Sequence, residues 1–199
     1  MKEEDLEKIF ERIKKIKGET RGLSFKIVEK FIEKEEGKEG VKKVEEEMVK
    51  LGYPISFEKI HPMNFYPLRS LAILFYCLKK LFNYNEKKVR EIGAFRARSS
   101  FFVRLYLTYF GSIEKIVKDI KKIWRKAVTI GDVKVLEYDK EKKSLIFRLE
   151  NYDLHPFQCQ YFIGLISAFL EIIVKSKVSC EEIKCTFRGD DAHEFLIKW

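Results

Sequence analysis

The chain has 199 residues, 46% of them hydrophobic and 36% charged, and a formal net charge of +9. This is long enough for one domain with a sizeable core, and the apolar content excludes a disordered chain. No apolar run reaches the roughly 18 uninterrupted residues of a membrane-spanning helix, and the charged first residues lack a secretory leader. The sequence therefore predicts a cytoplasmic protein without a membrane span.

Composition narrows the class of protein further. The four cysteines are unevenly spaced, which argues against a disulfide framework. Lys and Glu are abundant whereas glutamine occurs only as Gln158 and Gln160, a composition typical of a heat-adapted (thermophile) protein. The positive charge permits nucleic-acid binding, but most lysines alternate with glutamates at helical spacing, which is typical of solvated helix faces. Nucleic-acid binding is therefore the weaker interpretation.

The first two thirds of the chain has helical periodicity. Apolar residues spaced three and four apart predict helices over 3–16, 23–35, 41–51 and 68–82, one after Asn85 and one over Ser112–Ala127. Gly37 and Gly40 break the early pattern. The proline-rich stretch 53–67 predicts a connecting loop, and its apolar content indicates that it is pinned to a core or lines a cavity.

After Gly131 the period changes from near four to two. Alternating residues predict a hairpin over 133–149, then a long apolar helix over 153–175 that begins at Pro156 and is capped by Asp153 or His155. A second hairpin follows, with Ile183, Cys185 and Phe187 expected on one face. The predicted fold class is α+β: a helical subdomain, 1–130, packed on an antiparallel strand-strand-helix-strand-strand subdomain, 131–199, as one integrated domain.

The sequence carries no catalytic motif. Most acidic residues lie in lysine-rich faces, Asp190 and Asp191 belong to a turn, and no nucleophile elbow is present. The chain is therefore predicted not to be an enzyme.

Histidines and cysteines are the candidate metal ligands, and the sequence favours structural roles for them. None of His61, His155 and His193 has a second ligand at a suitable spacing on its own element. Cys180 and Cys185, five apart on a predicted strand, point to opposite faces and cannot share a metal ion without a bulge. Cys77 and Cys159 have the character of buried apolar residues. No metal site is predicted unless the fold brings distant cysteines together.

The stretch 90–109 mixes arginines with aromatic residues. Arg90, Arg96, Arg98 and Arg104 alternate with Phe and Tyr in a way that suits an anionic head group or stacked single-stranded nucleic acid. The simpler interpretation is a helix pair with arginines in solvent and aromatic residues in the core, and the apolar period favours it.

Several short motifs resemble a known superfamily. They are Tyr66-Pro67-Leu68 before a long helix, Val89 to Gly93, KIWRKAVTIGDVKV over 122–135, His155-Pro156 with Gly164, and the closing 195–199. With the predicted layout, they resemble the superfamily of heme–nitric-oxide-binding sensors, vinyl-4-reductase-type hydrocarbon-binding domains and transport-particle subunits. Within it, the chain is similar to a bacterial family abundant in myxobacteria.

The resemblance implies a ligand cavity between the helical part and the sheet, but it argues against heme. Heme-binding members carry a histidine on the helix before the sheet, and Ser112–Ala127 has none. They also carry Tyr-x-Ser-x-Arg, where this chain has Asn151-Tyr152-Asp153-Leu154-His155. The vinyl-reductase type has a terminal cysteine cluster, which Cys180 and Cys185 match in part.

We therefore expect a non-enzymatic sensor or binding module for an apolar or amphipathic small molecule, without heme or other cofactor. The expected pocket residues are Phe75, Arg98, Phe102, Arg104, Tyr106, Phe147 and Tyr161. The alternative is a protein-interaction or homodimerisation module whose pocket is filled by side chains.

Overall fold

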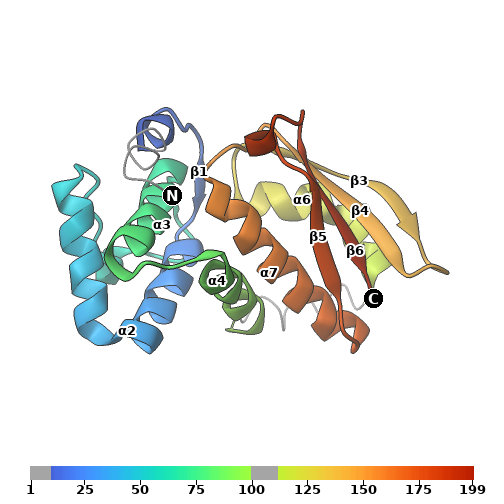
Figure 1. Ribbon diagram of the computed structural model, residues 1–199, viewed down its shortest axis with the longest axis horizontal. Helices are drawn as coiled ribbons and strands as arrows, with labels where there is room; N and C mark the ends of the chain where they lie inside the picture. Colours follow the sequence, from blue (N-terminus) through green and yellow to red (C-terminus); the bar gives the residue numbers. More distant parts are fainter. Residues whose placement is uncertain (1–9, 100–111) are drawn as a thin grey trace. The chain divides into compact units, whose positions relative to one another are not determined.

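The computed structural model describes residues 10–99 and 112–199. They form two compact units, Met1–Asn85 and Glu86–Trp199 (Figure 1). The sequence predicted the boundary between the helical and the sheet subdomain at residue 130. In the structure it falls earlier, because helix α4 (Glu86–Ser99) packs along helix α7 (Pro156–Val174) and α6 (Ile113–Ala127) packs on the sheet.

The first unit is built on two helices, α2 (Leu23–Lys50) and α3 (Leu68–Phe82), which contact each other. A short antiparallel ribbon of β1 (Glu19–Arg21) and β2 (Phe65–Pro67) accompanies them. The sequence predicted two helices separated by Gly37 and Gly40. The break at Gly37 is confirmed, because its φ of 71° and ψ of −177° are not helical and two helical segments of α2 meet there, whereas Gly40 lies within the second segment.

The connection between α2 and α3 is held to the core, as its apolar sequence predicted. Phe57, in the 3₁₀ helix η1 (Phe57–Lys59), and Ile60 are buried, whereas Met63 is exposed. The Glu45 carboxylate accepts a hydrogen bond from Phe57 N at 2.7 Å, and Lys26 Nζ donates to Phe57 O at 3.0 Å. These contacts fix an irregular segment against α2.

The second unit contains a four-stranded antiparallel sheet in the order β3-β4-β6-β5. The strands are β3 (Asp132–Asp139), β4 (Ser144–Glu150), β5 (Ser179–Lys184) and β6 (His193–Lys198), and the 3₁₀ helix η2 (Thr186–Arg188) follows β5. Helix α7 connects the two hairpins. The predicted α+β class and the strand-strand-helix-strand-strand order are confirmed.

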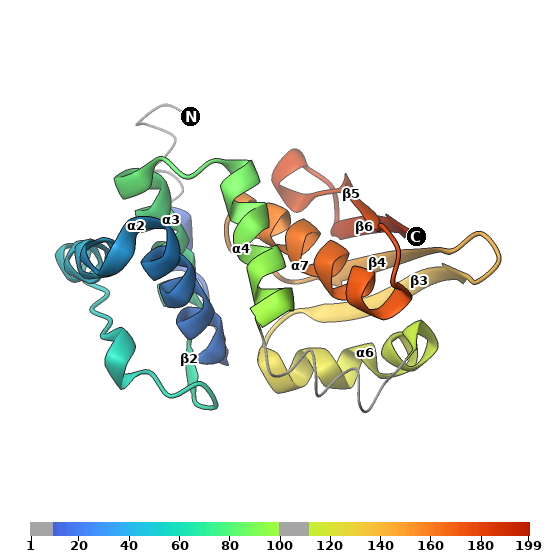
Figure 2. The same ribbon diagram turned by 90° about the horizontal axis from the view of Figure 1, so that it is seen from below.

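One face of this sheet is apolar and covered by helices. Leu145, Phe147 and Leu149 alternate on β4, and Phe195 and Ile197 on β6 continue the buried layer. Aromatic contacts from Phe162 of α7 to Phe195 and to Trp124 of α6 show that both helices share this face. Figures 1 and 2 show α7 lying between α4 and the sheet.

The start of α7 follows the predicted capping chemistry. Pro156 occupies the first turn, and His155 Nδ1 accepts a hydrogen bond from Phe157 N at 3.0 Å. Of the two candidate residues, His155 is therefore the N-cap of α7, and the Asp153 carboxylate makes a different contact. Among the described helices α7 alone has the length and composition to cross a membrane, a weak indication for a helix packed between α4 and the sheet.

Both edge strands carry a β-bulge. The register of β5 against β6 shifts between Glu182 and Lys184, so Ile183 is an extra residue, and its side chain is exposed. Leu136 of β3 occupies a similar irregularity and is also exposed. The expectation that Ile183 faces inward with Cys185 is wrong, because the bulge inserts one residue between the two inward positions.

Candidate metal centre

Four potential metal ligands meet on the helix-covered face of the sheet. Cys159 comes from the first turns of α7, Glu182 from β5, Cys185 from the residue before η2, and His193 from the start of β6. Their ligand atoms all lie within 4.8 Å of one another. These side chains come from α7, β5, β6 and the residue that follows β5, so the tertiary fold assembles the cluster.

The bulge at Ile183 places two of the four on the same face. Glu182 is in register with the buried Phe195, so its side chain points towards α7, and only 6% of it is exposed. Lys184 is in register with Glu194 on the other face. Cys185 then returns to the inner face, three residues after Glu182 instead of two. A regular strand would separate the two side chains.

The spacing of the ligand atoms fits a tetrahedral ion. With zinc–sulfur bonds of about 2.3 Å and zinc–nitrogen bonds of about 2.0 Å, a tetrahedron separates two sulfurs by about 3.8 Å and a sulfur and a nitrogen by about 3.5 Å. The distance from Cys159 Sγ to Cys185 Sγ is 3.8 Å, and that from Cys159 Sγ to His193 Nδ1 is 3.6 Å. Glu182 Oε1 lies 3.0 Å from His193 Nδ1. These three distances are close to those of a tetrahedral site, and all four ligand atoms lie within 4.8 Å of one another.

The thiols of the cluster are in an apolar setting. Burial raises the pKa of Cys159 far above its ordinary value, and the Glu182 carboxylate adds to the rise. Burial also raises the pKa of Cys185. Burial alone would raise the pKa of Glu182, but hydrogen bonds from His193 and Cys159 outweigh it, and this pKa lies below its usual value. A divalent cation entering the cluster therefore replaces the two thiol protons and balances two of the three negative charges that the thiolates and the carboxylate then carry.

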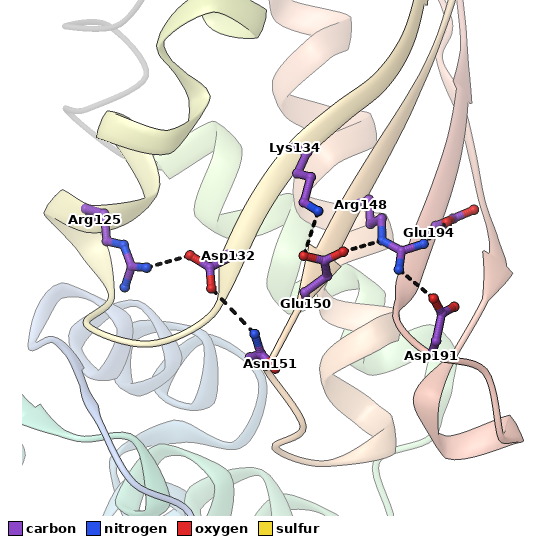
Figure 3. A network of polar contacts seen from close by, with 8 residues as sticks. All are labelled: Arg125, Asp132, Lys134, Arg148, Glu150, Asn151, Asp191 and Glu194. Carbon is purple, nitrogen blue, oxygen red and sulfur yellow. Dashed lines mark hydrogen bonds and ion pairs between the residues drawn. The ribbon is translucent and has the colours of Figure 1, made fainter.

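A charged network on the open face of the sheet holds the strand that carries His193. Arg148 of β4 donates to Glu150 at 2.7 Å, to Asp191 at 2.6 Å and to Glu194 at 2.5 Å (Figure 3). Asp191 and Glu194 flank His193 in sequence. The guanidinium therefore fixes the chain on both sides of this ligand from the opposite face of the sheet.

The pocket residues predicted from the sequence do not form this site. Phe147 and Tyr161 lie in the second unit and belong to its core, joined through the rings of Phe195 and Phe162. The Tyr161 hydroxyl accepts from Arg96 Nη1 at 2.8 Å. Arg98 pairs with Glu171 at 3.6 Å.

The other predicted pocket residues are placed elsewhere. Phe75 is buried in α3 of the first unit. Phe102, Arg104 and Tyr106 lie outside the described residues.

Sequence reasoning did not bring Glu182, Cys159 and His193 together as potential ligands. Each was assessed on its own element, where no partner stands at ligand spacing. A detectable pattern was Glu182-x-x-Cys185 followed by His193 across one hairpin, with Cys159 on the helix covering it. Cys180 is also on the inner face, in register with the buried Ile197, so the prediction that it opposes Cys185 is corrected. It does not belong to the cluster.

A gap with no room for a water molecule adjoins the cluster. Its lining residues are Tyr152, Gln158, Cys159, Phe162, Phe187 and His193. Gln158 is buried, and its Oε1 has no hydrogen-bond partner among the described residues. A buried amide oxygen without a hydrogen bond is costly, so a hydrogen-bond donor placed beside it would be stabilised.

Comparison with known proteins shows which solved structures have a similar architecture. No family model matches the sequence. An H-NOX protein from S. oneidensis in its Fe(II)NO state superposes with a TM-score of 0.66 at 14% identity, over 89% of this chain and 98% of that one. The unliganded Fe(II) H-NOX protein from K. algicida gives 0.63 at 16% identity, over 89% and 95%. The chain has an H-NOX-like fold.

A curated relative gives a partial sequence match. An uncharacterised protein from Methanocaldococcus jannaschii is 33% identical over 91 residues, which are 42% of this chain and 47% of the relative. The match thus spans about half the length of that relative. The likeness to H-NOX proteins concerns the fold, and the residues of the cluster have to be interpreted by their own chemistry.

Proposed function

We propose that this H-NOX-like domain is a non-enzymatic binding or sensor module that holds one zinc-class metal ion and no heme. The observation that carries the proposal is the convergence of Cys159, Glu182, Cys185 and His193 within 4.8 Å. Two sulfurs, an imidazole nitrogen and a carboxylate oxygen are a ligand set that suits zinc, and the sulfurs disfavour magnesium or calcium.

The proposed centre is structural and not catalytic. Four protein ligands complete a tetrahedral shell and leave no position for a reactive water, whereas catalytic zinc sites keep one position open. The ligands join α7 to both strands of the second hairpin, so an ion here ties the helix to the sheet. A closed shell also agrees with the absence of a catalytic motif in the sequence.

The residues of this chain do not fit heme. The chain's three histidines are accounted for without a heme ligand. His155 caps α7, His193 belongs to the cluster, and His61 Nδ1 accepts from Met63 N in the loop before α3. Helix α6 carries no histidine. The metal proposed here is therefore an alternative to heme in the same fold.

Small-molecule binding is the second part of the proposal. The buried Gln158 oxygen and the aromatic residues beside the cluster favour a largely apolar ligand with one donor group, which would have to open this closed gap to enter. The motifs that resemble the heme-free family abundant in myxobacteria support the same class of ligand. We place the module in the cytoplasm of a heat-adapted organism, and we keep a protein-interaction or homodimerisation module as the alternative.

Metal analysis tests the central claim. Protein expressed in zinc-supplemented medium is expected to retain one zinc per chain by elemental analysis, and hemin is expected to give no sharp Soret band. Cys159→Ser should lose the zinc. Cys180→Ser is the matched control, because Cys180 lies on the same face outside the cluster and should keep it. Equal zinc contents in the two variants would contradict the proposal.

Native mass spectrometry with lipid extraction tests the ligand. A bound small molecule that is lost together with the zinc would link the pocket to the centre. An interaction module instead predicts a ligand-free obligate dimer by light scattering.

A further inference from the structure

We infer that Asp153 and Thr186 are positioning residues that present His193 to the metal through Nδ1. This inference rests on the metal centre proposed above and assigns the outer contacts of its histidine. The two ring nitrogens of His193 lie in different surroundings. Nδ1 faces the cluster, 3.6 Å from Cys159 Sγ and 3.0 Å from Glu182 Oε1. Nε2 lies 3.0 Å from Thr186 Oγ1.

The direction of the hydrogen bonds follows from Asp153. Thr186 Oγ1 donates to Asp153 Oδ1 at 2.6 Å, so the one proton of the threonine hydroxyl is used there. The lone pairs of Oγ1 are then left to face His193. Nε2 must therefore be the donor, which gives the chain of donation His193 Nε2–H to Thr186 to Asp153.

This chain of donation fixes the tautomer that the centre needs. The Glu182 carboxylate can also only accept, so without an ion its 3.0 Å contact takes a proton from Nδ1. An ion among the four ligands replaces that proton, while the proton on Nε2 stays with Thr186 and the lone pair of Nδ1 faces Cys159 and Glu182. A metal ion among the four ligands takes this lone pair. Metal-bound histidines usually have such an outer partner, and its loss costs about 10- to 100-fold in metal affinity.

Asp153 contributes from the segment that leads into α7. It lies 3.4 Å from His193 Nε2 through Oδ1, so it also attracts the ring directly. The Asp153 side chain is 48% exposed whereas that of His193 is 4% exposed. The outer contacts thus sit at the rim of the centre, where a substitution leaves the apolar core intact.

The position of Thr186 gives the contact its rigidity. It is the first residue of η2 and directly follows the ligand Cys185, whose N–H donates to Asp190 Oδ2 at 2.7 Å. One short segment therefore supplies a ligand and the partner that orients another ligand.

Thr186→Val removes the hydroxyl at nearly constant volume and is the decisive variant. Zinc affinity is measured by competition with a chromophoric chelator, and the ring protonation of His193 by long-range ¹H–¹⁵N spectra of zinc-loaded protein. We expect a 10- to 100-fold loss of affinity for Thr186→Val and a near-normal affinity for Thr186→Ser, which restores the donor and acceptor. Wild-type spectra should show a proton on Nε2 and the metal on Nδ1.

The outcomes separate this inference from the proposed function. Zinc bound through Nε2, or equal affinities of wild type and Thr186→Val, would overturn the positioning role while the metal centre stands. A wild-type chain that takes up no zinc would overturn both. If Thr186→Val fails to fold, Asp153→Ala, at the exposed end of the chain of donation, carries the same test and is expected to lose affinity in the same direction.

Discussion

Gly93 of α4 and Gly164 of α7 face each other across the contact between the two helices. A Cβ atom on Gly93 would overlap the carbonyl oxygen of Tyr161, and one on Gly164 would overlap that of Arg90. Each glycine thus lets the backbone of the other helix approach closely. Arg90 and Gln160, joined by a hydrogen bond of 2.5 Å, and Arg98 and Glu171 flank this crossing.

Gly93→Ala is expected to destabilise the second unit. Alanine favours an isolated helix by about 1 kcal/mol, but here its methyl group meets backbone atoms that cannot rotate away, and overpacking costs about 1–3 kcal/mol. We expect a net loss of about 1–2 kcal/mol in the free energy of unfolding, measured by urea denaturation. Lys87→Ala, at an exposed position of the same helix, is the control. A Gly93→Ala chain as stable as that control would show that α4 and α7 can separate freely.

The metal ion is expected to raise thermal stability. An ion bound by α7, β5 and β6 binds the folded chain in preference to the unfolded one, and saturation at 1,000 times the dissociation constant stabilises by about 4 kcal/mol. Calorimetry should show a Tm that rises with zinc and falls after chelation. His193→Ala should remove this response, and His61→Ala should keep it. A Tm independent of zinc in wild type would contradict a structural ion.

Glu114 at the start of α6 is expected to make the unit sensitive to acid. Its own backbone N–H, followed by Lys140, Ser112 and Tyr138, lowers its pKa from 4.5 to about 2. A depressed carboxyl pKa contributes stability that is present above pH 4.5 and is lost as the pH falls towards 2. Glu114→Gln should flatten this part of the stability profile, measured by denaturation at each pH. Glu141→Gln on the β3–β4 turn should leave it unchanged.

Arg148→Met is expected to weaken both the sheet and the metal centre. The substitution leaves Glu194, whose side chain is only 6% exposed, with Lys184 at 3.3 Å as its cationic neighbour among the described residues. Removing the guanidinium leaves the buried Glu194 carboxylate less well paired, which is destabilising. Because Asp191 and Glu194 flank His193, zinc affinity should fall as well. Lys134→Met, which removes the Lys134–Glu150 pair at 2.9 Å, should have the smaller effect on zinc.

Local chemistry made much of the fold predictable. The β3–β4 hairpin follows from alternation. Ser112 caps α6 by accepting from Lys115 N at 3.4 Å, and Pro156 opens α7, as their positions in the sequence indicated. These features depend on neighbouring residues, so a single sequence contains them.

The unpredicted features depend on contacts between distant segments. Gly93 and Gly164 were visible as motif residues, but nothing in either segment says that they meet, and their meeting assigns α4 to the second unit. The cluster was missed for the same reason. Cys159 has an ordinary apolar helical context, and His193 has an ordinary strand context until Thr186 and Glu182 are placed around its ring.

Because of the bulge at Ile183, the metal centre depends on the number of residues between Glu182 and Cys185. Deleting Ile183 would leave Glu182, Lys184 and Cys185 in regular alternation, so Glu182 and Cys185 would still face α7. Inserting one residue after Lys184 would instead turn Cys185 towards solvent while every ligand remained in the sequence. We therefore expect zinc binding to survive the deletion and to be abolished by the insertion, a tolerance that substitutions alone would not reveal.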